Sequence, residues 1–167
     1  MDVLKNLVTK AYLDIETTGL SPNYYDLTVV GLHLEDDNDE VVQFVGEEIC
    51  SSELLKIIKK VDTVYTYNGA RFDLPFIKGK LKLDITRHCQ HEDLMYVCWQ
   101  KNLYGGMKEV ERKLGIKRKI ADVDGWIAVQ LWHNYKFNGC NISLKKLLEY
   151  NKEDILNLKK IRKKLKF

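Results

Sequence analysis

The first half of the chain carries the hydrophobic patterns of β-strands. Polar and apolar residues alternate over Lys10–Glu16, and Leu27–Leu34 is a run rich in residues that favour strands. A third apolar segment, Val41–Val45, follows the polar turn Asp36–Glu40. Because only short loops separate the three segments, we expect them to form an antiparallel meander.

After residue 50 the pattern becomes helical. Apolar residues at helical spacing predict a helix that Ser51-Ser52-Glu53 can cap and that runs through Lys60. A fourth strand is expected over Thr63–Tyr67, where Asn68-Gly69 supplies a turn. Two further elements are expected downstream, a short helix near Leu74–Gly79 and a weak strand around Asp84–His88.

From residue 93 onward the chain reads as helices near 93–103, 107–114, 124–136 and 147–166, with breaks at Gly105-Gly106, Gly115 and Phe137-Asn138-Gly139. No repeat or linker-like stretch interrupts the sequence, so residues 1–167 are expected to form one domain. The order of elements predicts an α/β fold. Its mixed sheet combines the antiparallel three-stranded meander with parallel strands, and its C-terminal half is helical.

The composition is that of an ordinary globular chain, because 45% of the 167 residues are hydrophobic and 31% are charged. No apolar run approaches the roughly 20 residues that span a bilayer, and the N-terminus lacks the pattern of a signal peptide. A membrane protein is therefore not expected. The four cysteines are scattered without a C-x-x-C pair, which favours reduced thiols and a cytoplasmic location over a zinc ribbon or a disulfide framework.

The net charge of +3 hides an uneven distribution of charged residues. Residues 1–50 hold 11 acidic and two basic residues, a net charge of −9, whereas residues 51–167 hold 13 acidic and 25 basic residues, a net charge of +12. Such a chain could hold cations at one place and a polyanion at another. An accident of surface composition explains the charge equally well.

Asp14 and Glu16 form the first candidate site, within the segment Tyr12–Leu20. Residues i and i+2 of a strand share a face, so the two carboxylates lie side by side while Leu13 and Ile15 point into a core. They repel each other unless a cation lies between them, and Mg²⁺ and Mn²⁺ prefer oxygen ligands of this kind. A solvated polar strand face is the alternative, but the Thr-Thr-Gly-Leu turn that follows, with its exposed backbone N–H groups, favours a site.

Three more residues have a defined local setting. Asp73 lies at or near the start of a helix that carries Pro75 in its first turn, and taken alone it is most simply an N-cap. Tyr150 and Asp154 are i and i+4 on a helix, one turn apart on the same face. By itself that spacing is common, and a surface helix would also explain it.

Together these segments resemble the DEDD (DnaQ-like) exonucleases of the ribonuclease H-like superfamily. The motif D-x-E-T-T-G-L stands at Asp14–Leu20, and N-x-x-x-F-D-x-P-F stands at Asn68–Phe76. Y-x-x-x-D stands at Tyr150–Asp154, which is similar to the tyrosine (DEDDy) branch. The order of the motifs matches across essentially the whole chain. The stretches Tyr104–Lys108 and Leu114–Ile116 also resemble compact, stand-alone prokaryotic members classed as predicted exonucleases.

The resemblance implies a ribonuclease H-like fold and a site for two divalent cations, Mg²⁺ or Mn²⁺, roughly 3.5–4 Å apart. The metal ligands that it implies are Asp14, Glu16, Asp73 and Asp154. Tyr150 would orient or deprotonate the attacking water, and with an ordinary pKa of about 10 it would need the help of the metal to act as a base. The substrate contacts that it implies are Thr17 and Thr18 at the 3′-hydroxyl, Leu20 against the terminal base, and Asn68 and Phe72 at the phosphate and sugar.

Asp93 and Lys108 each have a structural and a functional interpretation. Asp93 opens a helical run, where an N-cap is favoured over an outer acid near the metals. Gly105-Gly106, before the helix of Lys108, could present N–H groups and a cation to a phosphate, but such a pair is at least as often a turn between helices. The histidines show no paired metal spacing and are treated as structural or surface residues: His33, His88, His91 and His133.

The C-terminal half contains an aromatic helix and a basic tail. The aromatic helix around Trp126–His133 could stack nucleic-acid bases, but core packing is favoured for it. The tail Lys159–Lys166 carries six basic residues beside an apolar seam. For this tail, a solvated helix face and a patch that follows a nucleic-acid backbone are equally open interpretations.

The sequence therefore predicts a cytoplasmic, metal-dependent 3′–5′ exonuclease that acts on the 3′ ends of single-stranded DNA or RNA and releases nucleoside monophosphates. One alternative is a structure-specific or endonucleolytic enzyme that uses the same metals. Another is a non-catalytic nucleic-acid-binding module, which would have no need for all four acids. No membrane association is expected, no protein partner can be inferred, and no residue distinguishes DNA from RNA as the substrate.

Overall fold

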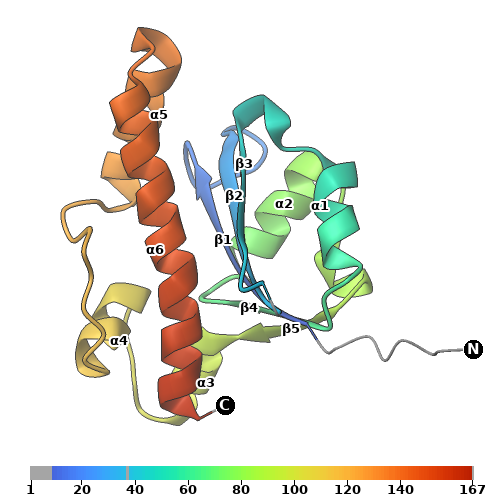
Figure 1. Ribbon diagram of the computed structural model, residues 1–167, viewed down its shortest axis with the longest axis vertical. Helices are drawn as coiled ribbons and strands as arrows, with labels where there is room; N and C mark the ends of the chain where they lie inside the picture. Colours follow the sequence, from blue (N-terminus) through green and yellow to red (C-terminus); the bar gives the residue numbers. More distant parts are fainter. Residues whose placement is uncertain (1–8, 37, 167) are drawn as a thin grey trace, which may run out of the picture.

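The computed structural model describes residues 9–36 and 38–166. A twisted sheet lies between two helical layers, with α1 and α2 on one side and the long helix α6, with α5 beside it, on the other (Figure 1). The strands are β1 (Lys10–Thr17), β2 (Leu27–Glu35), β3 (Val41–Val45), β4 (Thr63–Thr66) and β5 (Gln90–Asp93). The α-helices are α1 (Ser51–Ile58), α2 (Asp73–Leu81), α3 (Leu94–Gln100), α4 (Met107–Lys113), α5 (Gly125–Asn138) and α6 (Asn141–Leu165).

The sheet has the mixed topology that the sequence predicts. Its strand order is β3-β2-β1-β4-β5. The pairs β1–β2 and β2–β3 are antiparallel, whereas β1–β4 and β4–β5 are parallel. The first strand therefore occupies the centre of the sheet, where helices cover both of its faces.

Alternate residues of β1 serve two separate cores. Ala11, Leu13 and Ile15 pack with the apolar faces of α1 and α2, whereas Tyr12 packs with α3, α4 and α6. Because side chains alternate across a strand, Asp14 and Glu16 belong to the same face as Tyr12. The period-2 pattern thus turns both acids toward α6.

Two of the predicted element boundaries are wrong. The segment expected as a strand around Asp84–His88 contains instead a short 3-10 helix, Ile85–Arg87, because the Asp84 carboxylate accepts a hydrogen bond from the Thr86 hydroxyl (2.7 Å) and fixes a local turn. The strand is β5, a polar segment that pairing with β4 makes extended. In addition, α6 begins at Asn141 rather than near residue 147, and Ser143 in its first turn accepts a hydrogen bond from Asn134 of α5.

The helix predicted from residue 51 is present, but its N-cap is Cys50 and no side chain caps it.

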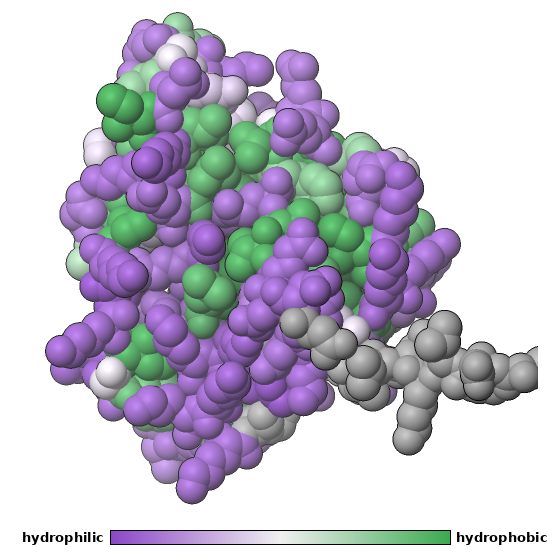
Figure 2. Space-filling model, viewed as in Figure 1, coloured by the Kyte–Doolittle hydropathy of each residue, from purple (hydrophilic) through white to green (hydrophobic). Residues whose placement is uncertain are grey.

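Within the described residues, no helix has both the length and the apolar character that crossing a membrane requires. Figure 2 shows hydrophobic residues in patches between the α5–α6 pair and the α1–α2 layer, surrounded by hydrophilic ones. Several large apolar side chains are exposed, among them Leu20, Tyr24, Trp126, Phe137 and Ile142.

Gly31 of β2 lets α6 approach the sheet closely. The strand register aligns Asp14, Gly31 and Gln43 across β1, β2 and β3. A Cβ atom at Gly31 would lie 2.2 Å from Asn151 Oδ1 and 2.3 Å from Ile155 Cδ1, so the missing side chain makes room for α6. Asn151 uses this space to reach both neighbouring strands, as described below.

We expect Gly31→Ala to lower the free energy of unfolding by about 1–3 kcal/mol, because the added methyl group overpacks the contact between β2 and α6. Chemical denaturation with far-UV circular dichroism measures this change. Gly125→Ala is the matched control, because a Cβ at the first residue of α5 meets no atom within 4 Å. Equal stability of the two variants would contradict the close approach of α6 to the sheet.

Candidate active site

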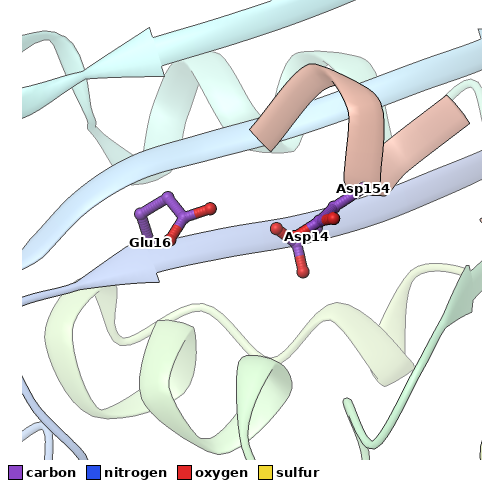
Figure 3. A group of neighbouring side chains, drawn as sticks. All are labelled: Asp14, Glu16 and Asp154. Carbon is purple, nitrogen blue, oxygen red and sulfur yellow. The ribbon is translucent and has the colours of Figure 1, made fainter. Parts of the chain in front are cut away.

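Three carboxylates from two distant segments meet beside the sheet. Asp14 and Glu16 project from β1 and Asp154 projects from α6 (Figure 3). One carboxylate oxygen from each lies within 4.8 Å of the others. Glu16 and Asp154 are buried and Asp14 is half-buried. The cluster forms because Asp14 and Glu16 share one face of β1 and α6 places Asp154 against that face.

The cluster forms part of the wall of an open cavity of about 280 Å³. Most of the site residues expected from the sequence line it, together with α5: Asp14, Ile15, Glu16, Thr17, Gly19, Leu20, Phe72, Gly125, Val129, Tyr150 and Asp154. The Thr17 hydroxyl donates to the Gly19 carbonyl oxygen (2.7 Å) and thereby tightens the turn after β1. Leu20 stands at the rim with 84% of its surface exposed.

Asp73, Thr18 and Asn68 do not line this cavity. Asp73 is the first residue of α2, and its buried carboxylate accepts a hydrogen bond from the backbone N–H of Ile15 (3.2 Å) rather than capping the helix. It lies next to the cluster but outside the group of three. Thr18 instead ties down the loop after β1, since its hydroxyl oxygen accepts a hydrogen bond from the Asp26 N–H (2.8 Å).

Asp93 holds the turn that contains Asn68. One Asp93 oxygen accepts hydrogen bonds from the N–H groups of Asn68 (2.8 Å) and Met95 (3.1 Å), and the other accepts one from Ala70 (3.0 Å). The N-cap interpretation of Asp93 is therefore confirmed. Its carboxylate also shapes the left-handed turn at Asn68, where φ is 63°.

Burial and mutual repulsion make the cluster unfavourable without a cation. Burial raises the pKa of Asp14 to about 7, although a hydrogen bond from Asn151 and the charge of Arg118 oppose the shift. Burial and the charge of Asp14 raise the pKa values of Glu16 and Asp73 well above their ordinary range. An all-oxygen donor set in this state fits a hard divalent cation such as Mg²⁺ or Mn²⁺, which would restore the ionised carboxylates.

Asn151 fixes Asp14 relative to α6. Its amide nitrogen donates to Asp14 Oδ2 (2.9 Å), and its amide oxygen accepts a hydrogen bond from Gln43 Nε2 (2.9 Å). The side chain is fully buried. Sequence reasoning placed Asn151 inside a motif but assigned it no role, because its importance depends on the space above Gly31.

Arg118 is a second residue that the sequence did not reveal. Its buried guanidinium forms an ion pair with Asp154 and others with Glu111 (3.2 Å) and Glu153 (3.9 Å). Glu111 also accepts a hydrogen bond from Asn157 (3.1 Å). The arginine lies in a loop far from the motifs in sequence, and only the packing of that loop on α6 brings it to Asp154.

Tyr150 lies close to two cations. Lys108 Nζ is 5.3 Å and Arg118 Cζ is 5.7 Å from the centroid of its ring. Burial and the charges of Glu16 and Asp14 raise the pKa of the phenol above its ordinary value. In the metal-free protein the hydroxyl group is therefore protonated at neutral pH.

The histidines and the aromatic helix are mainly structural. His91 is hydrogen-bonded to the Thr66 hydroxyl (2.9 Å) and His33 to Asp39 (3.0 Å). Trp132 is buried in the core between α5, α6 and β2, as core packing predicts. Trp126 departs from that prediction, because 71% of its surface is exposed.

The basic tail is partly occupied by contacts within the chain. Lys159 forms ion pairs with Asp39 (2.6 Å) and Glu35 (3.8 Å), and Lys160 donates to Asn157 (2.8 Å). Lys163 lies 3.8 Å from Glu35 but is largely exposed. The pairs of Lys159 favour a structural role for that residue over a contact with nucleic acid.

We expect Asp14→Asn to stabilise the metal-free protein. Because the pKa of Asp14 is raised, the folded state binds more protons than the unfolded state between about pH 4 and pH 7, and stability falls as the pH rises through this range. Thermal unfolding in the presence of a chelator, at about pH 5 and about pH 8, should show a smaller fall for the variant. Glu40→Gln, at an exposed carboxylate, should leave the fall unchanged.

The chain has recognisable relatives in sequence family and in structure. The model of the RNase_H superfamily matches residues 11–166. No curated protein sequence matches the chain. In structure it is similar to the family B DNA polymerase from the hyperthermophilic archaeon Pyrobaculum calidifontis, with a TM-score of 0.74 and 13% identity, over 95% of this chain and 24% of the polymerase.

Two nucleases are also similar in fold. One is a nuclease in its apo form, with a TM-score of 0.62 and 18% identity, over 93% of this chain and 70% of that one. The other is zinc-bound E. coli exonuclease I in complex with single-stranded DNA, with a TM-score of 0.53 and 14% identity, over 86% of this chain and 42% of that one. The chain therefore spans about a quarter of the polymerase and less than half of exonuclease I.

The family match covers nearly all of the residues that build the sheet, the cavity and α6. The mixed five-stranded sheet, with its first strand at the centre, is the ribonuclease H-like fold that the motifs implied. The chain belongs to the RNase_H superfamily.

Proposed function

We propose that the protein is a metal-dependent 3′–5′ exonuclease that hydrolyses the terminal phosphodiester bond of single-stranded DNA or RNA. The observation that carries the proposal is the convergence of Asp14, Glu16 and Asp154, with Tyr150 beside them, on the wall of one open cavity. Membership of the RNase_H superfamily supports a nuclease. The fold likeness to E. coli exonuclease I, whose complex contains single-stranded DNA, is consistent with this class of substrate.

The carboxylates Asp14, Glu16 and Asp154 would hold the divalent cations, Mg²⁺ or Mn²⁺, and Asp73 would complete a site for two of them. When bound, such ions polarise the phosphodiester and lower the pKa of water. The residues of the chain supply the geometry, since Asn151 orients Asp14 and Arg118 holds Asp154.

Tyr150 would orient the attacking water. The raised pKa of its phenol keeps the proton on the hydroxyl group, so that Tyr150 is better suited to hold the water by a hydrogen bond than to deprotonate it. Its position on the cavity wall, one helical turn from Asp154, places this hydroxyl-bearing ring near the carboxylates.

The cavity also supports a contact with the end of a strand. Leu20 presents an exposed apolar side chain at the rim, where the terminal base can cover it, and Phe72 lines the cavity. Thr17 remains a candidate for binding the 3′-hydroxyl. The contacts implied for Thr18 and Asn68 rest on the resemblance, because neither residue lines the cavity.

We expect Mn²⁺ to raise the unfolding temperature of the wild type, because an ion that binds only the folded state stabilises it by about 2.7 kcal/mol at 100 times its dissociation constant. Asp14→Ala should lose both this stabilisation and the nuclease activity, whereas Glu40→Gln should keep both. Differential scanning fluorimetry with Mn²⁺ or chelator, together with gel assays of labelled oligonucleotides, measures the two effects. Cleavage by Asp14→Ala at the wild-type rate would contradict the metal site.

We expect a 3′-phosphate to block degradation and a 5′-phosphate to have no effect, because the proposed site binds the 3′ end. Matched DNA and RNA oligonucleotides with 5′ or 3′ labels, resolved on denaturing gels, should show stepwise shortening from the 3′ end. A circular single strand is the control and should stay intact. Its rapid internal cleavage would favour an endonuclease, and binding without cleavage would favour a non-catalytic module.

A further inference from the structure

Lys108 differs from the other cation beside Tyr150 in its partners. Arg118 is paired with three carboxylates, those of Asp154, Glu111 and Glu153. Within residues 9–36 and 38–166, by contrast, Lys108 forms no ion pair, and its ammonium group donates to the backbone carbonyl oxygen of Val123. Arg118 is thus committed to carboxylates of the protein, whereas no carboxylate of the described residues lies within ion-pair distance of Lys108.

Lys108 is not among the residues that line the cavity, but its ammonium group lies close to two that do. It is 5.3 Å from the ring centroid of Tyr150, which forms part of the cavity wall. Its acceptor, Val123, comes two residues before Gly125, which lines the cavity at the start of α5. Lys108 is held between two parts of the wall, close enough to Glu16 for its charge to oppose the rise in the pKa of that carboxyl group.

The chemistry of the ammonium group leaves it free to bind an anion. A lysine has three N–H donors, and Val123 accepts from only one of them. Its half-buried position and the nearby charge of Arg118 lower the pKa of the ammonium group, and the charges of Asp124, Glu111 and Glu153 partly oppose that shift. A phosphate oxygen in the cavity would supply a further acceptor and a negatively charged partner at hydrogen-bond distance.

We propose that Lys108 is a substrate-binding residue that contacts a non-bridging oxygen of the scissile phosphate. This proposal rests on the exonuclease function proposed above. In the sequence, Gly105 and Gly106 precede α4, and the glycine turn delivers Lys108 in the first turn of that helix. The ammonium group of Lys108 would then hold the terminal phosphodiester linkage beside the carboxylate cluster.

The test compares two short oligothymidylates that each carry one neutral methylphosphonate linkage, at the 3′-terminal position in one and in the interior in the other. Affinities are measured in Ca²⁺ by fluorescence anisotropy, with gels to show that the strands stay intact. We expect Lys108→Gln to weaken binding of the interior-modified strand roughly tenfold, the value of one charge-assisted hydrogen bond. Binding of the strand with the neutral terminal linkage should change by less than about twofold, because that strand lacks the charge that Lys108 contacts.

Lys59→Gln is the matched control, because it removes one positive charge at the C-terminal end of α1, on the opposite side of the sheet from α6 (Figure 1). It should weaken both strands equally and by less than about twofold. Lys108→Arg should retain most of the discrimination between the two strands. Thermal unfolding of Lys108→Arg and Lys108→Gln checks that both variants fold.

Three outcomes overturn the proposal. If the wild type shortens strands from the 3′ end and Lys108→Gln behaves like Lys59→Gln, Lys108 does not contact the scissile phosphate and the exonuclease function stands. If Lys108→Gln weakens the binding of both strands equally, Lys108 again does not contact the scissile phosphate, because its contact would then lie elsewhere along the strand. If the wild type neither binds nor degrades any strand, the exonuclease function is wrong and this role of Lys108 is wrong with it.

Discussion

The position of the Asn151 side chain is the constraint on which the candidate site depends. Its buried amide joins α6 to Asp14 on β1 and to Gln43 on β3, and it fits only because Gly31 on the strand between them has no side chain. Tyr150 and Asp154 belong to the same helix, so the contact that docks α6 also sets their position relative to the strand carboxylates. The contact that holds α6 beside Asp14 thus also sets the geometry of the site, together with further polar contacts of α6 such as that of Arg162 with the Tyr12 hydroxyl (3.0 Å).

The site is costly to the fold that carries it. Burial and repulsion raise the pKa values of Asp14, Glu16 and Asp73. Folding therefore removes these carboxylates from water, which costs free energy when they are ionised. Arg118 offsets part of this cost by pairing with Asp154. The remaining repulsion between the carboxylates would favour the binding of a divalent cation, because a positive charge between them would relieve it.

Much of the fold could be predicted from the sequence, because it depends on local pattern. The alternation in Lys10–Thr17 and the i, i+4 spacing of Tyr150 and Asp154 were enough to predict which side chains share a face. The strand β5 was missed because a polar segment became extended through pairing with β4. Arg118 and Asn151 were missed for a related reason, since their roles come from contacts between segments that are distant in sequence.

Charged residues from the acidic and the basic parts of the chain meet near Tyr150. The acidic first 50 residues supply Asp14 and Glu16, whereas the basic remainder supplies Lys108 and Arg118. The segment that carries these two cations is held on α6 by Glu153, which accepts hydrogen bonds from the N–H groups of residues 119 (2.6 Å) and 120 (2.9 Å). The docking of this segment on α6 therefore brings carboxylates from the acidic part of the chain and basic side chains from the rest to one tyrosine.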